Sequence, residues 1–149
     1  KQFECGSESV FFALTLTLTL PPLSLPVVSI KSNPVMFDFE KLDVYKKAKV
    51  FNSGLREFIN ITRLDSSTKN QLRRAAFSVV LNLAEGSGRF TNPDRRNFYI
   101  VARSSIFECI AILDILKDEA VIEENSFRGF YNEAEELSKT LFTMIKNLQ

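Results

Sequence analysis

Six arginines are the residues of this sequence that are best suited by type to bind a charged partner. They are Arg73, Arg74, Arg89, Arg95, Arg96 and Arg103. A guanidinium presents several N–H donors in a planar fork that matches the oxygens of a phosphate group. Phe90 and Tyr99 lie among the arginines and offer rings on which bases can stack. The pattern predicts a surface that binds RNA or DNA, and the alternative is a solvated helix face whose arginines form ion pairs between subunits.

The distribution of charge favours a basic surface even though the total charge does not. The net charge is only +1. From residue 56 to residue 103, however, nine Lys and Arg stand against four Asp and Glu, and from residue 104 to residue 149 four stand against nine. Such a split predicts a basic and an acidic face, which can attract a polyanion or pair subunits head to tail.

Two glutamates, Glu85 and Glu108, fall on the two helices expected at the centre of the fold. Di-iron helical bundles place glutamates in such positions, but they also need two Glu-x-x-His motifs, and this sequence contains no His. We therefore predict neither a metal nor a cofactor. We expect instead a buried polar network that sets the register of the helices. Its expected members are Asn82, Glu85, Ser104, Ser105 and Glu108.

Catalytic motifs are not recognisable in the sequence. Without His, a Ser or Cys nucleophile lacks its usual general base. Cys109 falls in an apolar helical pattern and is predicted to be a core residue. The segment Gly86-Ser87-Gly88-Arg89 has neither the spacing nor the preceding strand of a nucleotide-binding loop. We interpret it as a turn in which Gly86 takes the left-handed position after a helix end, and we predict that the protein is not an enzyme.

Apolar residues recur at steps of three and four from Met36 onward, which predicts four helices. The expected ranges are 38–62, 67–85, 92–119 and from about residue 123 to the C-terminus. Short connections make consecutive helices antiparallel, so the predicted fold is an all-α, up-down-up-down four-helix bundle. The third helix has apolar residues on more than one side, which predicts contact with another subunit.

Residues 1–35 do not share this pattern. Val10–Leu20 is apolar with alternating Thr, and Pro21-Pro22 ends the run. The run has about half of the ~20 residues that a membrane-spanning helix needs. We predict a non-core N-terminal extension, disordered or outside the native fold, in front of a bundle domain at 36–149. The alternatives are a targeting or membrane-associating segment and a structural strand.

Two stretches of the sequence resemble a known protein family. They are QLRRAAFSVVLNLAEGSGR at 71–89 and RRNFYIVARSSIFECIAIL at 95–113, and FDFEKLDVYKKA at 37–48 is similar to the family's start. The most specific part is the Asn-x-Ala-Glu-Gly motif, here Asn82, Ala84, Glu85 and Gly86. These motifs resemble the four-helix-bundle proteins encoded by intervening sequences in bacterial 23S rRNA genes, over residues 36–149.

This resemblance implies properties that the residues alone do not provide. It implies a cytoplasmic protein without enzymatic activity or membrane contact that assembles as a ring-like homo-oligomer, a pentamer. It also implies kinship with the accessory variability protein of diversity-generating retroelements, which binds nucleic acid and a reverse transcriptase through a basic barrel. Arg73, Arg74 and Arg89 match positions of the family pattern.

Overall fold

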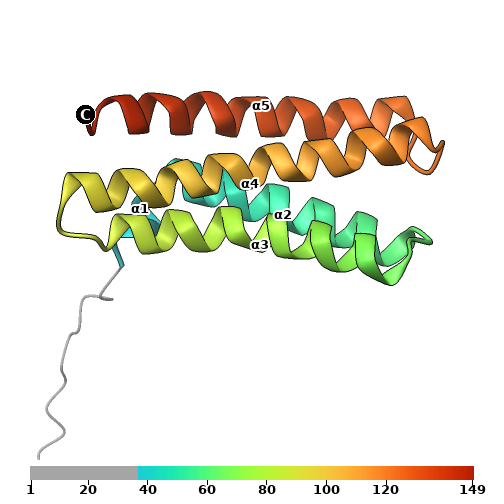
Figure 1. Ribbon diagram of the computed structural model, residues 1–149, viewed down its shortest axis with the longest axis horizontal. Helices are drawn as coiled ribbons and strands as arrows, with labels where there is room; N and C mark the ends of the chain where they lie inside the picture. Colours follow the sequence, from blue (N-terminus) through green and yellow to red (C-terminus); the bar gives the residue numbers. More distant parts are fainter. Residues whose placement is uncertain (1–36) are drawn as a thin grey trace, which may run out of the picture. The chain divides into compact units, whose positions relative to one another are not determined.

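The chain folds as a bundle of long α-helices (Figure 1). The computed structural model describes residues 37–149, so the expectations for residues 1–35 lie outside the described residues. The helices are α1 (Asp38–Lys41), α2 (Asp43–Ile61), α3 (Ser66–Ser87), α4 (Asn92–Asp118) and α5 (Glu124–Lys146). No strand occurs between residues 37 and 149. The predicted all-α class is confirmed.

The four long helices are arranged in chain order around the core. Each packs against its neighbours in the sequence, and α5 also packs against α2 to close the bundle. Within residues 37–149, the backbones of the diagonal pairs α2/α4 and α3/α5 lie further apart than those of neighbouring helices. Figure 1 shows the helices running along a common direction with their connections at alternating ends. This arrangement is the predicted up-down-up-down topology.

The predicted first helix is interrupted near its start. Leu42 has extended backbone (φ −75°, ψ 120°), which separates the four-residue α1 from α2. The backbone N–H of Phe37 donates to the Glu40 carboxylate at 2.9 Å and caps α1. Because α1 packs against both α2 and α3, the interruption lets the chain cover one end of the bundle. The prediction of a single helix over residues 38–62 was therefore wrong at Leu42, where the chain breaks into α1 and α2.

Local capping explains where α3 and α4 begin. The Asp65 carboxylate accepts from the backbone N–H groups of Ser67 at 2.8 Å and Thr68 at 3.0 Å. The Thr91 hydroxyl accepts from the N–H of Asp94 at 3.3 Å, and Pro93 occupies the first turn of α4. These contacts satisfy donors that a helix start otherwise leaves without partners.

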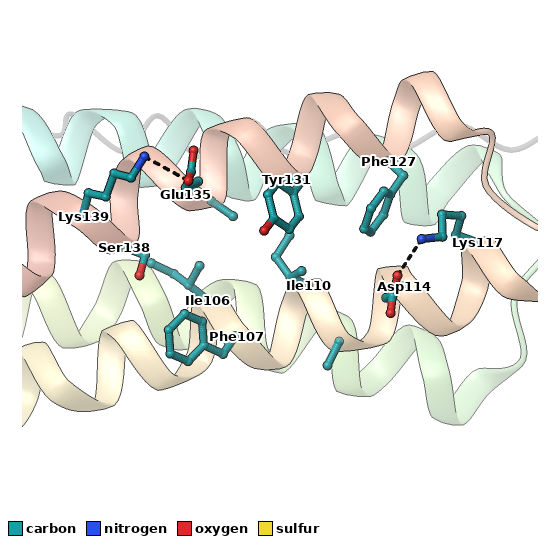
Figure 2. Close-up of a pocket in the computed structure, with 12 residues that line it drawn as sticks. Ile106, Phe107, Ile110, Asp114, Lys117, Phe127, Tyr131, Glu135, Ser138 and Lys139 are labelled. Atoms are coloured by element: carbon teal, nitrogen blue, oxygen red, sulfur yellow. Dashed lines mark hydrogen bonds and ion pairs between the residues drawn. The ribbon is translucent and has the colours of Figure 1, made fainter.

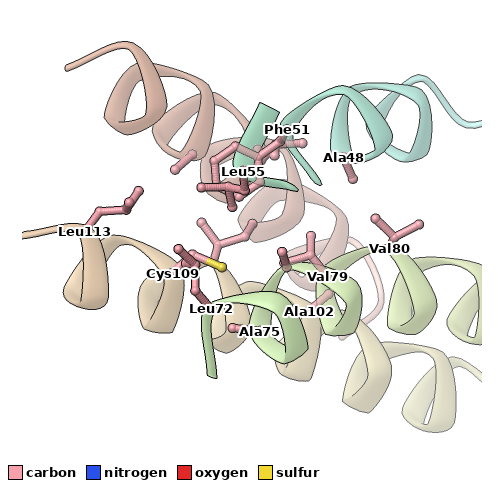
Figure 3. Packing of buried hydrophobic residues seen from close by; sticks show 14 of the residues in the cluster. Ala48, Phe51, Leu55, Leu72, Ala75, Val79, Val80, Ala102, Cys109 and Leu113 are labelled. Carbon is pink, nitrogen blue, oxygen red and sulfur yellow. The ribbon is translucent and has the colours of Figure 1, made fainter. Parts of the chain in front are cut away.

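The core lies between all four long helices (Figure 3). Phe51 and Leu55 of α2 face Leu72 and Val79 of α3 and Cys109 of α4 across this core. Burial raises the pKa of the Cys109 thiol to about 12, with a smaller contribution from the neighbouring Glu108 carboxylate. Cys109 is thus a packing residue that stays protonated at neutral pH, as its position in the apolar pattern predicted.

Between residues 37 and 149, none of the helices combines the length and the apolar character that crossing a bilayer requires.

Candidate nucleic-acid interface

The structure divides the six predicted arginines among three places. Arg73 and Arg74 lie on the N-terminal half of α3. Arg89 lies in the turn between α3 and α4 (residues 88–91, the α3–α4 turn), and Arg95 and Arg96 lie in the first turns of α4. Arg103 lies further along α4. The six therefore do not form one continuous cluster.

Arg73 and Arg74 are exposed, and neither forms an ion pair with any residue between 37 and 149. They line an open groove of about 800 Å³ along α3, to which α4 contributes Glu108. Glu85 and Glu108 line the same groove, as do Asn82 and Ser78. The groove therefore combines two guanidinium groups that are unpaired within residues 37–149 with hydrogen-bonding side chains and two carboxylates.

Arginine side chains also build the α3–α4 turn. The Arg89 guanidinium pairs with the Glu85 carboxylate and lies 4.4 Å from the centre of the Phe98 ring. Nη2 of Arg95 donates to the carbonyl oxygen of Arg89 at 2.9 Å. Arg95 and Arg96 are half-buried, and the Nε of each has no hydrogen-bond partner within residues 37–149. This end of the bundle thus holds three guanidinium groups around a short turn.

Arg103 connects α4 to α5. Its Nε donates to the Ser138 hydroxyl at 3.1 Å. Its guanidinium lies 4.7 Å from the centre of the Phe107 ring and 5.6 Å from that of Phe142. These contacts hold the Arg103 side chain against α4 and α5. Arg103 therefore lies apart from the other five arginines and contributes to helix packing.

A glycine sets the distance between the end of α3 and the start of α4. Gly86 lies inside α3, so the left-handed position predicted for it was wrong. A Cβ atom placed on Gly86 would lie 2.7 Å from Cε1 of Tyr99, which is closer than Cβ contacts occur. Tyr99 is buried beneath this contact, and its burial raises the pKa of its phenol while Arg95 opposes the shift. Tyr99 is therefore unavailable for base stacking, contrary to the prediction.

The predicted buried polar network is smaller than expected and contains a residue that was not foreseen. Ser105 is buried, and its hydroxyl bonds to that of Ser78 at 2.7 Å and to the carbonyl oxygen of Val101 at 2.9 Å. Nδ2 of the half-buried Asn82 donates to the carbonyl oxygen of Ser78 at 2.8 Å and to its hydroxyl at 3.0 Å. This network joins α3 to α4.

The other three predicted members are not buried. Glu85, Ser104 and Glu108 are exposed, and Glu85 uses its carboxylate to bind Arg89. Their inclusion in a buried network was wrong because the helix faces that carry them point away from the core. Ser78 could have been found from its spacing, since it lies one helical turn before Asn82 on the same side of the helix.

A second groove, between α4 and α5, was not foreseen from the sequence (Figure 2). Its volume is about 580 Å³, and Ile106, Ile110 and Phe127 contribute much of its wall. Two ion pairs border it, Asp114 with Lys117 at 2.8 Å and Glu135 with Lys139 at 2.9 Å.

Among residues 37–149 no group of three or more Cys, Asp or Glu is arranged to hold a metal ion.

Comparisons with known proteins agree with this architecture. A protein of unknown function from the S23 ribosomal protein family of Bacteroides thetaiotaomicron VPI-5482 has a similar solved structure, with a TM-score of 0.65 and 21% identity. The match covers 69% of this chain and 98% of that chain, and at this identity it shows a shared fold. No curated protein matches the sequence.

The family resemblance carried by the motifs at 71–89 and 95–113 is also confirmed. The family model described as 23S rRNA-intervening sequence protein matches residues 40–143, which include both motifs and parts of all four long helices. The chain therefore belongs to the 23S rRNA-intervening sequence protein family.

Proposed function

We propose that this protein is a non-catalytic nucleic-acid-binding protein. It contacts phosphate groups through Arg73 and Arg74 on α3 and through Arg89, Arg95 and Arg96 around the α3–α4 turn. The observation that carries the proposal is that Arg73 and Arg74 are exposed and form no ion pair within residues 37–149. By contrast, Arg89 in the α3–α4 turn already has an acidic partner, Glu85, near the end of α3.

The spacing of these arginines suits an extended polyanion. Arg74 lies about 20 Å from the end of α3 at Ser87, because each helical residue adds ~1.5 Å, and Arg89 follows in the α3–α4 turn. A nucleic-acid strand carries one phosphate on every nucleotide, so several phosphates of one extended strand lie within that length. Arginine forms bidentate hydrogen bonds to phosphate oxygens, so the arginines on α3 and those around the α3–α4 turn can hold the same strand. The cytoplasmic location implied by the resemblance is part of this proposal.

The double variant Arg73→Ala/Arg74→Ala tests the proposal. We expect its affinity for single-stranded RNA to depend less on salt: the slope of log affinity against log salt should be smaller in magnitude by about 1.4, since each arginine that binds a phosphate of a single strand adds ~0.7 to the slope. The measurement is fluorescence anisotropy with a labelled RNA over a range of salt concentrations. Arg128→Ala/Lys139→Ala is the matched control, because it removes two positive charges that are paired on α5. Equal slopes for the two double variants would exclude the α3 site.

A second candidate function, self-assembly, is favoured by a separate observation. The outer side of α4 carries large apolar residues that the bundle leaves exposed, which are Ile100, Val101, Phe107 and Ile115. Ile115 has an exposed fraction of 58%. Exposed apolar patches of this kind are characteristic of protein interfaces. We propose that this side of α4 contacts another copy of the chain in a homo-oligomer, for which the resemblance implies a pentamer.

Substitution of Ile115 by Glu tests self-assembly. We expect the wild-type chain to sediment as a multiple of its 17.0 kDa mass. Ile115→Glu should sediment as the monomer, because an unpaired charge at a dry interface costs several kcal/mol. Ile61→Glu is the control, since Ile61 is 79% exposed at the end of α2. A wild-type chain that sediments as a monomer at all concentrations tested would refute this second function.

A further inference from the structure

Phe90 is unusual among the aromatic residues of the described chain. Its exposed fraction is 102%, so the fold covers none of its ring. It lies in the α3–α4 turn directly after Arg89 and directly before Thr91, which caps α4. Other exposed aromatic residues, such as Phe77 and Phe142, are less open and have a guanidinium against the ring.

The backbone that presents Phe90 is held firmly on both sides. Before it, the Arg89 carbonyl oxygen accepts from Nη2 of Arg95 at 2.9 Å. After it, the Thr91 hydroxyl accepts from the Asp94 N–H and donates to the Asp94 carboxylate at 2.6 Å. A turn held in this way loses little further conformational entropy when its ring binds a partner.

The groups around Phe90 match one class of partner. The guanidinium groups of Arg89, Arg95 and Arg96 belong to the same turn and the first turns of α4. The Arg89 guanidinium is already paired with Glu85, so Arg95 and Arg96 are the arginines of this end that lack an acidic partner within residues 37–149. An open aromatic ring with arginines in the same turn is an arrangement that proteins use to bind single-stranded nucleic acid, with bases on the ring and phosphates near the charges. A base inside a duplex is already stacked on both faces and does not offer a free face to a protruding ring.

We infer that Phe90 is a stacking platform for an unpaired nucleobase, so that the protein selects single-stranded over double-stranded nucleic acid. The inference rests on the proposed nucleic-acid function and specifies its ligand. RNA and DNA share the stacking chemistry, and the experiment distinguishes them. Arg73 and Arg74 supply the backbone contacts, and Phe90 supplies the preference for an unpaired base.

The sequence offers a clean reporter for this contact because it contains no Trp. The variant Phe90→Trp therefore carries a single tryptophan in this sequence, and that tryptophan is at the proposed stacking position. We expect single-stranded oligoadenylate, as RNA or as DNA, to quench its fluorescence on binding, and the same strand paired with its complement to leave it unquenched. RNA and DNA titrations, compared directly, show which of the two is bound more tightly.

Two truncations measure the energy of the same contact. Phe90→Ala should weaken single-strand binding by about 5- to 150-fold, the range found when one stacked aromatic is removed. Phe90→Leu should weaken it nearly as much, because leucine keeps the apolar volume but has no π-face. Tyr131→Ala is the control, since Tyr131 is a 47%-exposed aromatic on α5. Helical content measured by circular dichroism verifies that each variant is folded.

The outcomes separate this inference from the function on which it rests. If the Phe90 variants bind single strands as wild type does, while Arg73→Ala/Arg74→Ala weakens binding, the platform is refuted and the proposed function stands. Equal quenching by single strand and duplex also refutes it. If wild type binds neither form, both ideas fail. A Phe90→Ala variant that alters only the sedimentation of the protein would assign the ring to a protein contact and overturn the inference.

Discussion

Replacing Phe51 by Ala is expected to lower the free energy of unfolding by about 3–5 kcal/mol, the cost of removing a fully buried phenyl ring. Phe51 has an exposed fraction of 1%. Its ring meets that of Phe130 edge to face, with 6.5 Å between the centres, and Phe58 meets Phe130 in the same way at 5.9 Å. These rings join α2 to α5, so the truncation weakens the packing that closes the bundle.

Unfolding in urea followed by circular dichroism measures this effect, since helix dominates the described fold. Phe90→Ala is the control because it removes the same ring from a fully exposed position, and it should change the stability by no more than about 0.5 kcal/mol. The thermal midpoint of Phe51→Ala should fall by about 10 °C or more. A Phe51→Ala variant as stable as Phe90→Ala would show that α5 does not pack on α2 as described.

Two Gly→Ala substitutions within helices are expected to act in opposite directions. At Gly86 of α3, a Cβ would lie 2.7 Å from Cε1 of the buried Tyr99 and 3.0 Å from Cβ of Phe98. Neither neighbour has room to move, because Tyr99 is only 3% exposed and Cβ of Phe98 is bonded to the backbone. Overpacking of this kind costs about 1–3 kcal/mol, which is at least as large as the ~1 kcal/mol that Ala gains over Gly in a helix.

At Gly129 of α5, a Cβ would have no neighbouring atom of residues 37–149 within 4 Å beyond its own helix backbone. Gly129→Ala should therefore raise the stability by up to about 1 kcal/mol through helix propensity alone. Gly86→Val should destabilise more than Gly86→Ala, because its additional methyl groups meet the same two side chains. Urea unfolding of the three variants checks these signs. A stabilising Gly86→Ala would mean that α4 does not approach α3 as closely as described.

Much of the local structure could be read from the sequence because it depends on nearby residues. The hydroxyl and carboxylate side chains at Asp65 and Thr91 act within three residues of their own positions, so the starts of α3 and α4 were predicted nearly where they occur. The break at Leu42 was missed because the apolar spacing continues through it, and only the packing of α1 on α3 requires the chain to turn there.

The candidate site was predicted less completely, for a physical reason. Residue type identified the arginines but did not show which of them already have partners. Arg103 donates a hydrogen bond to Ser138, thirty-five residues away in the sequence, whereas Arg73 and Arg74 form no ion pair within the described chain. Tyr99 and Phe90 looked equivalent as stacking surfaces, yet one lies beneath Gly86 and the other is fully open.

The helical class, the order of the four long helices, the starts of α3 and α4 and the family could be predicted from the sequence, because periodicity, capping side chains and motifs are properties of neighbouring residues. The role of Gly86, the real extent of the Ser78–Asn82–Ser105 network and the exposure of Phe90 came from tertiary packing. Each of these depends on the distance between α3 and α4 or on what covers the turn between them. These features result from the packing of the whole bundle, so they cannot be predicted from any single stretch of the sequence.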